Sequence, residues 1–157
     1  MESTILVPML VLLLVGAMEI GKITVTYFTL HKALRGAARL ASTLRGANFC
    51  DPQDTQLLAI KNFVVFGPGG DTATPIVRDL TADRIEILPE RADAATSTLA
   101  ECECSGSSGC LASEGGRAPD YLTASIADGY PFQPRIPFRT LDPILLRPRV
   151  RVPFGGL

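Results

Sequence analysis

The chain has no tryptophan and a single histidine, and only 20% of its 157 residues carry a charge. One histidine is too few for a multi-histidine metal site or for an obvious histidine-dependent catalytic centre. Neither a G-x-S-x-G nor an H-E-x-x-H motif is present, and no spacing of the acidic residues singles out a catalytic pair. The sequence therefore argues against an enzyme, and we expect no cofactor, no bound metal and no small-molecule substrate.

Net charge is also small, with a formal value of -1 at pH 7. A dedicated nucleic-acid-binding protein usually carries a strong positive charge, so nucleic acid is not an expected partner. The charge is unevenly divided: residues 1–49 contain five basic and two acidic residues, whereas residues 50–157 contain ten basic and fourteen acidic residues. This asymmetry indicates a basic N-terminal segment and a mildly acidic C-terminal body.

A long apolar segment lies near the N-terminus. Residues 5–18 read ILVPMLVLLLVGAM without a charge, and a second, mostly apolar segment follows Glu19. A membrane-spanning helix needs about 20 apolar residues, so a secretory signal, an interfacial helix and a buried core helix are alternatives to a transmembrane helix. The signal fits poorly because residues 1–4 contain no basic residue.

The apolar residues after Glu19 favour one long helix, because they recur at alternating steps of four and three. The resulting packing stripe consists of Ile23, Tyr27, Leu30, Leu34, Ala37, Ala41 and Leu44. A helix from Ser3 to Gly46 would be about 65 Å long. Its N-terminal half is expected to need lipid or neighbouring helices, and its C-terminal half a partner face. Pro8 predicts a kink, because proline removes one backbone hydrogen bond.

Two acidic residues stand out in this segment as candidates for assembly and register, together with Lys22. Glu19 lies one turn before Lys22. It is either an acid at the membrane edge that pairs with Lys22, or a buried charge that meets a base of a neighbouring subunit and fixes register. Glu2 has the same two interpretations, as an exposed terminal acid or as a partner for the free amine of another chain.

Residues 47–157 predict a small head, separate from the transmembrane and assembly helix at 1–46. Asp51 and Pro52 are typical of a helix N-cap and first helical residue, and predict a short helix to Phe63. Alternating apolar and polar residues predict strands near 84–88, 97–101, 121–127 and 149–152. Six of the twelve prolines fall in 131–153 and predict a stiff, extended loop before the last strand. The expected fold is α+β, with a long N-terminal helix, a small antiparallel sheet and a short helix.

All four cysteines lie in the head, at Cys50, Cys102, Cys104 and Cys110. Downstream of a membrane helix, they predict disulfides in an oxidising compartment. A bond between Cys102 and Cys104 would be strained, so two pairings remain, in which one of these two joins Cys50 and the other joins Cys110. A zinc site and reduced structural cysteines are the alternatives, although the C-x-C spacing lacks the usual C-x2-C zinc knuckle.

The end of the chain is rich in arginine, with Asp142 as the one opposing acid. The candidate basic patch consists of Arg135, Arg139, Arg147, Arg149 and Arg151. One interpretation is a solvated edge strand that charge protects from aggregation. The other is a surface for a partner subunit, an anionic surface or nucleic acid.

The N-terminal segment resembles that of TadE/TadG-like pilin proteins, which reads E-F-A-L-V-L-P, an aliphatic run and then G-I-x-E-F-G-R. Glu2, Pro8 and Glu19 fall on the first acid, the proline and the second acid of that pattern. Residues 33–41, ALRGAARLA, resemble the A-A-R-x-G-A-R-x-A helix that follows it in the family. Residues 121–134 resemble more loosely the strand Y-V-x-V-x-A-S-Y-x-F-x-P of the same proteins.

The resemblance implies a minor pilin or pseudopilin of a tight-adherence (type IVc) pilus, with a role in surface adhesion or secretion. Its implied partners are the membrane, other pilin-like subunits, a prepilin peptidase and a platform protein. The head would lie outside the cytoplasm, on the inner membrane or on a cell-surface pilus. The cysteines favour this orientation, although the bases after the helix favour the opposite one by the positive-inside rule. The alternative is a single-pass, membrane-anchored binding protein that never enters a filament.

Overall fold

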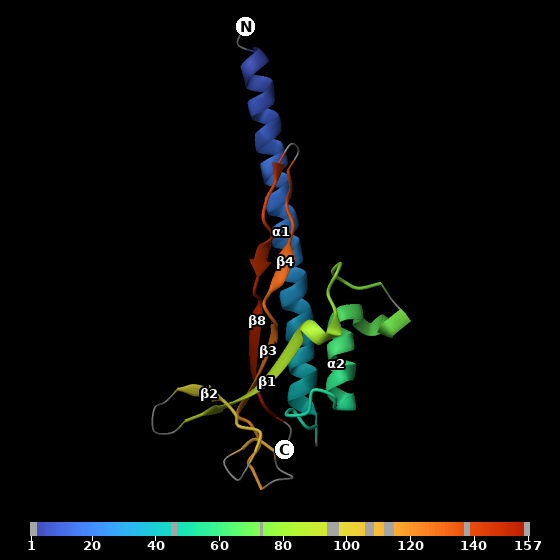
Figure 1. Ribbon diagram of the computed structural model, residues 1–157, viewed down its shortest axis with the longest axis vertical. Coiled ribbons are helices and arrows are strands. Elements are labelled where there is room, and N and C mark those ends of the chain that lie inside the picture. Colours follow the sequence, from blue (N-terminus) through green and yellow to red (C-terminus); the bar gives the residue numbers. More distant parts are fainter. Residues whose placement is uncertain are drawn as a thin grey trace.

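The computed structural model describes residues 3–44, 47–72, 74–93, 98–105, 109–111, 115–136 and 139–155. A single long helix, α1 (Ser3–Thr43), forms the axis of the molecule. Its N-terminal end projects alone, and the rest of the chain lies beside the remainder of the helix (Figure 1). The remaining helices are α2 (Thr55–Phe66) and the short 3-10 helices η1 (Gly67–Thr72) and η2 (Ala82–Arg84).

A four-stranded antiparallel sheet with the order β2-β1-β3-β8 forms the head. Its strands are β1 (Ile85–Ala92), β2 (Leu99–Glu101), β3 (Tyr121–Ile126) and β8 (Arg149–Pro153). The predicted α+β layout of a long N-terminal helix, a small antiparallel sheet and a short helix is confirmed. All four strand predictions fall on these strands to within a few residues.

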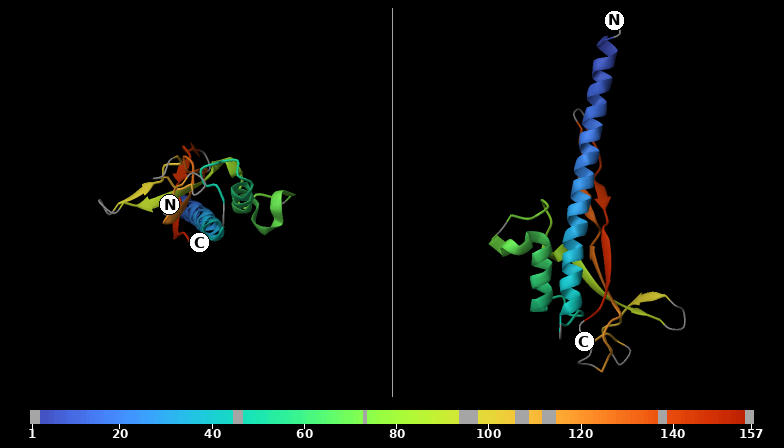
Figure 2. Two further views of the ribbon diagram at one scale, coloured as in Figure 1. Left: turned by 90° about the horizontal axis from the view of Figure 1, so that it is seen from below. Right: turned by 180° about the vertical axis from the view of Figure 1, so that it is seen from behind.

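One face of the sheet packs on the two helices and forms the core. Alternate residues of the strands point to this face, as the period of an extended chain requires. Helix α1 packs over β3 and β8, and α2 packs beside α1 near β1 (Figure 2). The sheet contributes Ile85, Ile87, Leu122, Ala124, Ile126 and Val150 to this core, and α1 contributes Leu30, Leu34, Ala37, Ala38 and Ala41. The C-terminal part of α1 and the head therefore share one core, so the expected boundary at residue 46 divides the sequence but not the packed structure.

Beyond the sheet, β3 and β8 continue into a two-stranded ribbon that runs along α1 toward its N-terminal end (Figure 1). The ribbon consists of β4 (Tyr130–Phe132), β5 (Arg135–Ile136), β6 (Arg139–Thr140) and β7 (Ile144–Leu146). Strand β4 pairs with β7, and β5 pairs with β6. Gly129 makes the step from β3 to β4 with a φ of 79°, where a Cβ atom would lie 2.8 Å from Cγ of Arg147.

The prediction of a stiff, extended loop in this region was wrong. The prolines are compatible with pairing because a two-stranded ribbon has free edges, where a residue without an N–H group breaks no ladder hydrogen bond. Pro131, for example, lies opposite Leu145 within the β4–β7 pair.

The predicted start of the second helix was also wrong. Asp51 and Pro52 lie in a turn, in which the Asp51 side chain accepts a hydrogen bond from the Gln53 N–H. The N-cap of α2 is Asp54, whose Oδ1 accepts from the N–H groups of Gln56 (2.8 Å) and Leu57 (3.2 Å). Asp51 and Asp54 are both suitable N-caps. A helix that starts after Asp54 begins its buried apolar face at Leu57, and Asp54 is the cap that the structure uses.

Replacing Asp54 by alanine is expected to lower the free energy of unfolding by about 1 kcal/mol, the usual loss for an N-cap acceptor. The backbone N–H of Asn48 also donates to this carboxyl and lowers its pKa, burial raises it, and the N–H groups of Leu57 and Gln56 lower it further, so that it lies below its ordinary value. The stabilisation is therefore present above the ordinary pKa and is lost as pH falls through the folded-state value. Thermal unfolding of Asp54→Ala and Asp54→Asn checks this, because asparagine keeps the cap acceptor.

Candidate membrane and assembly surfaces

The N-terminal half of α1 presents apolar side chains in all directions. Leu6, Leu10, Leu13 and Met18 are each at least 59% exposed, and the apolar side chains of Val7, Met9, Val11, Leu12 and Leu14 are 50–63% exposed. The helix has the length and composition of one that crosses a membrane. Pro8 lies within it, and α1 continues past Pro8 without interruption. Glu2 lies outside the described residues.

The packing stripe is covered by the head of the same chain. Leu30, Leu34, Ala37 and Ala41 are fully buried against the sheet and α2, and Ile23 and Leu44 are partly buried. Tyr27, at 38% exposure, is the most exposed residue of the stripe. The spacing thus identified a true packing face, but its partner within this chain is the chain's own sheet.

Glu19 is 7% exposed and has partners for both oxygens. Nζ of Lys22 lies 2.6 Å from Oε1, and the backbone N–H of Arg135 donates to Oε2 over 3.2 Å. Glu19 thus combines the Lys22 pair of the first interpretation with the burial of the second, and both interpretations stay predictions. The second oxygen is bound by the ribbon, a contact between residues 116 positions apart in sequence that no local pattern could predict.

The opposite side of α1 stays exposed below Glu19. Ile20, Val25 and Phe28 are 66–67% exposed, although the inward side at this level already packs on the ribbon and sheet. The exposed side then becomes basic, with Lys32, Arg35 and Arg39. This strip (Ile20, Val25 and Phe28), termed here the outer α1 strip, extends the apolar surface about 13 Å beyond Glu19 at 1.5 Å per residue.

The four arginines of the predicted patch whose side chains the structure describes do not form one surface. Arg149 and Arg151 point to the sheet face away from the helices and bind Glu90, with Nη2–Oε1 and Nε–Oε2 distances of 2.5 and 2.6 Å. Arg147 is exposed below β7, and Arg135 is exposed at the far end of the ribbon. Arg139 lies in β6, but its side chain is outside the described part of the structure.

Glu90 is the residue that the sequence analysis missed. Its side chain is 5% exposed, and the open sheet face around it also carries Glu86, Thr123 and Tyr121. Burial raises the pKa of Glu90, but hydrogen bonds with Arg151 and Thr123 and the charges of Arg151 and Arg149 outweigh it and hold the pKa below its usual value. The strand alternation places Glu90 on the same face as Glu86. Its pairing with Arg149 and Arg151 could not be predicted from that alternation, because it depends on the position of β8 two strands away in the sheet.

The four cysteines form two disulfides, Cys50–Cys104 and Cys102–Cys110. This is one of the two pairings that the sequence left open, and it leaves no cysteine free. The first bond joins the segment between α1 and α2 to the loops beyond β2. The second closes a short loop among those same loops.

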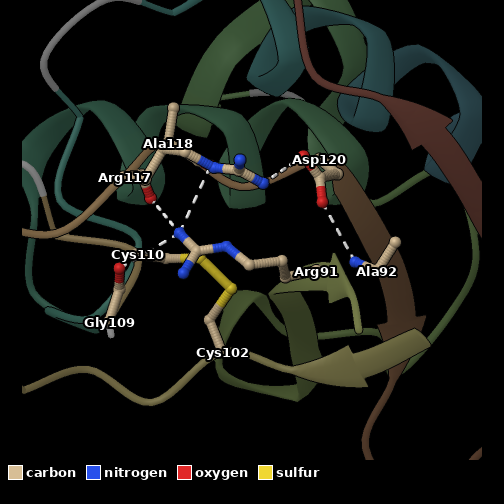
Figure 3. A network of polar contacts seen from close by, with 8 residues as sticks. All are labelled: Arg91, Ala92, Cys102, Gly109, Cys110, Arg117, Ala118 and Asp120. Atoms are coloured by element: carbon tan, nitrogen blue, oxygen red, sulfur yellow. Dashed lines mark hydrogen bonds and ion pairs between the residues drawn. A yellow bond between two sulfur atoms is a disulfide. The ribbon is translucent and has the colours of Figure 1, made fainter. Parts of the chain in front are cut away.

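Arg91 organises the loops at this end of the head (Figure 3). Its Nη2 donates to the carbonyl oxygens of Gly109 (3.1 Å) and Ala118 (3.4 Å) and also to that of Arg117. Nη2 of Arg117 lies 3.2 Å from Oδ1 of Asp120. Backbone carbonyls at fixed positions accept these bonds, so the network together with the disulfides holds a region with little regular structure.

Within the described residues, no group of three or more His, Cys, Asp or Glu side chains is arranged to hold a metal ion. Comparison of the chain with protein-family models, with curated proteins and with solved structures gives no match. The exposed half of α1 and the outer α1 strip are accordingly the surfaces from which a function can be argued.

Proposed function

We propose that the chain is a pilin-like structural subunit, a minor pilin or pseudopilin of a tight-adherence (type IVc) pilus or tip complex. Its helix anchors it in the inner membrane and later packs among the helices of neighbouring subunits. The observation that carries this proposal is the division of α1 into an exposed apolar segment, residues 6–14, and a longer segment that packs on the ribbon and the head. The resemblance of residues 2–22 and 33–41 to TadE/TadG-like proteins supports the same function.

The exposed apolar half needs a non-aqueous environment. A leucine or valine left in water forgoes roughly 1.5 kcal/mol or more of burial free energy, and seven exposed leucine and valine side chains lie between Leu6 and Leu14. Lipid and a bundle of similar helices both satisfy this surface, because lipid tails are as apolar as leucine. Transfer from bilayer to filament therefore leaves the apolar burial nearly unchanged.

The outer α1 strip favours assembly over simple anchoring. A helix that only anchors a head needs apolar residues across the membrane, whereas Val25 and Phe28 lie six and nine residues beyond Glu19, at the level of the ribbon. A neighbouring helix would cover them and would leave Lys32, Arg35 and Arg39 to meet the acidic heads of other copies. The two disulfides support a head outside the cytoplasm. Other pilin-like subunits, a platform protein and a prepilin peptidase are the partners that this function requires.

Replacing Val25 and Phe28 together by serine is expected to remove the chain from sheared surface fibres while leaving it in the membrane fraction. Both side chains are about two-thirds exposed, so the head should fold unchanged. Immunoblots of sheared fibres and of membranes measure both pools. The matched control is Leu99→Ser, an exposed residue of β2 on the head, which should leave incorporation at the wild-type level.

A wild-type chain that is absent from sheared fibres would contradict the proposal and support the anchored binding protein instead. Normal incorporation of the Val25→Ser, Phe28→Ser variant would contradict the role of the outer α1 strip.

A further inference from the structure

The far end of the ribbon is held at a fixed height on α1. The backbone N–H of Arg135 donates to Oε2 of Glu19, and β5 packs on α1. The orange and red strands of the ribbon rise along α1 in two views that differ by half a turn (Figures 1 and 2). Strand β5 therefore lies beside Glu19, immediately after the apolar segment of α1.

This height corresponds to the headgroup layer of a membrane that takes up the helix. The uncharged run ends at Met18, and Glu19 with Lys22 follows. The polar layers add about 5–8 Å on each side of the hydrocarbon core, which is about four or five helical residues. Residues 19–23 of α1 and, with them, Arg135 fall within that layer.

The groups at this height suit a surface of anionic lipid. Lys22 keeps 59% of its side chain exposed although it pairs with Glu19, and Arg135 is exposed. Leu141, which follows β6, is 36% exposed. The one nearby acid on the ribbon, Asp142, comes two residues after Thr140, the partner of Arg135, so it lies about 6–7 Å further from the membrane at the rise of a strand.

We propose that the end of the ribbon, with Arg135 beside Lys22, is a second membrane contact of this protein and binds the phosphate groups of anionic lipids. The proposal rests on the membrane anchoring of α1 but not on filament assembly. Guanidinium groups bind phosphate oxygens in bidentate fashion, and each cation near an anionic surface contributes about 1 kcal/mol. Two points of contact, α1 and the ribbon, would fix the tilt of the head on the bilayer.

The test uses the full chain with Leu141→Cys, labelled with an environment-sensitive fluorophore. It is inserted into vesicles of phosphatidylcholine alone or of phosphatidylcholine with phosphatidylglycerol. The label should enter the headgroup layer in the anionic vesicles, where headgroup nitroxides quench it. Arg135→Gln should lower about fivefold the ratio of molecules whose ribbon contacts the lipid headgroups to those whose ribbon does not, since it removes one cation. High salt should also lower this ratio, because it screens the attraction between the cations and the anionic lipid.

The matched control is Arg147→Gln, an exposed arginine at the other end of the same ribbon, which should leave the quenching unchanged. Quenching that is equal in both vesicles, or that Arg135→Gln does not reduce, overturns the proposal. Quenching that depends on the protein-to-lipid ratio but not on phosphatidylglycerol also overturns it, because it assigns the contact to another copy. Failure of the chain to float with either vesicle overturns the anchoring as well, and so separates the two claims.

Discussion

Replacing Cys50 and Cys104 together by serine is expected to lower the free energy of unfolding of the head by about 4 kcal/mol. The two residues are 54 positions apart in sequence, and in the chain-entropy model a crosslink stabilises by restricting the unfolded chain, more so for longer loops. The loop that this disulfide closes contains all of α2, β1 and β2, so its loss frees much of the head at once. Hydrogen exchange of the β1 and β3 amides, with the full chain in detergent micelles, measures the change.

The second disulfide provides an internal comparison. Cys102 and Cys110 are 8 positions apart, for which the same model gives about 2.5 kcal/mol. The double serine variant at these positions should therefore lose clearly less stability, and its exchange should accelerate mainly in the loops that Arg91 holds. Equal losses in the two variants, or a larger loss at the shorter loop, would contradict the assignment of the stabilisation to loop length.

The helical part of the fold could be predicted from the sequence because its signals are local. An uncharged run followed by apolar residues at steps of three and four specifies a helix whatever it packs on, and α1 ends within three residues of the predicted Gly46. The four strands of the sheet, β1, β2, β3 and β8, follow equally from short-range alternation. The α2 start was misplaced because Asp51 and Asp54 are both good caps, and only the tertiary packing of Leu57 decides between them.

The parts that failed depend on contacts between distant segments. The prolines of the ribbon predicted a loop, because proline is excluded from central strands. The sequence does not show that these strands have free edges, where proline is tolerated. The partner of the packing stripe was sought outside the chain, since a helical period shows which side is buried and not what buries it. The sequence could not decide whether Cys102 or Cys104 pairs with Cys50, because the two cysteines are only two positions apart. In the structure Cys104 forms this bond.

The candidate patch of arginines shows the same limit at the level of charge. Five arginines in 17 residues suggested one surface, but two of them are turned toward Glu90 on a strand from a different part of the sequence. The single carboxylate of Glu90 pairs with both Arg149 and Arg151 and offsets one of their two charges. Of the others, Arg135 is exposed at the far end of the ribbon and Arg147 at its near end, so the described arginines are spread over separate places.

Replacing Glu90 by glutamine is expected to lower the free energy of unfolding of the head by about 3 kcal/mol. Removing one partner of a buried ion pair costs about 3–5 kcal/mol, and the lower end applies because Arg149 and Arg151 keep 58% and 41% of their side chains exposed to water. Two arginines on one strand would then face each other without the carboxylate between them. The matched control is Glu86→Gln on the same strand and face, whose exposed side chain should change stability by less than about 0.5 kcal/mol.

The pH dependence distinguishes the charge of Glu90 from its shape. Because its folded-state pKa lies below the ordinary value of 4.5, the carboxylate stabilises the head above pH 4.5, and this contribution is lost as pH falls through the folded-state pKa. The arginines stay charged over this pH range. Glu86, on the same face, is present in both the wild type and the Glu90→Gln variant, so it does not contribute to their difference. The stability difference between wild type and Glu90→Gln, measured by hydrogen exchange at a series of pH values, should therefore shrink on acidification. A difference that stays constant with pH would show that packing of the side chain, and not its charge, holds β1 to β8.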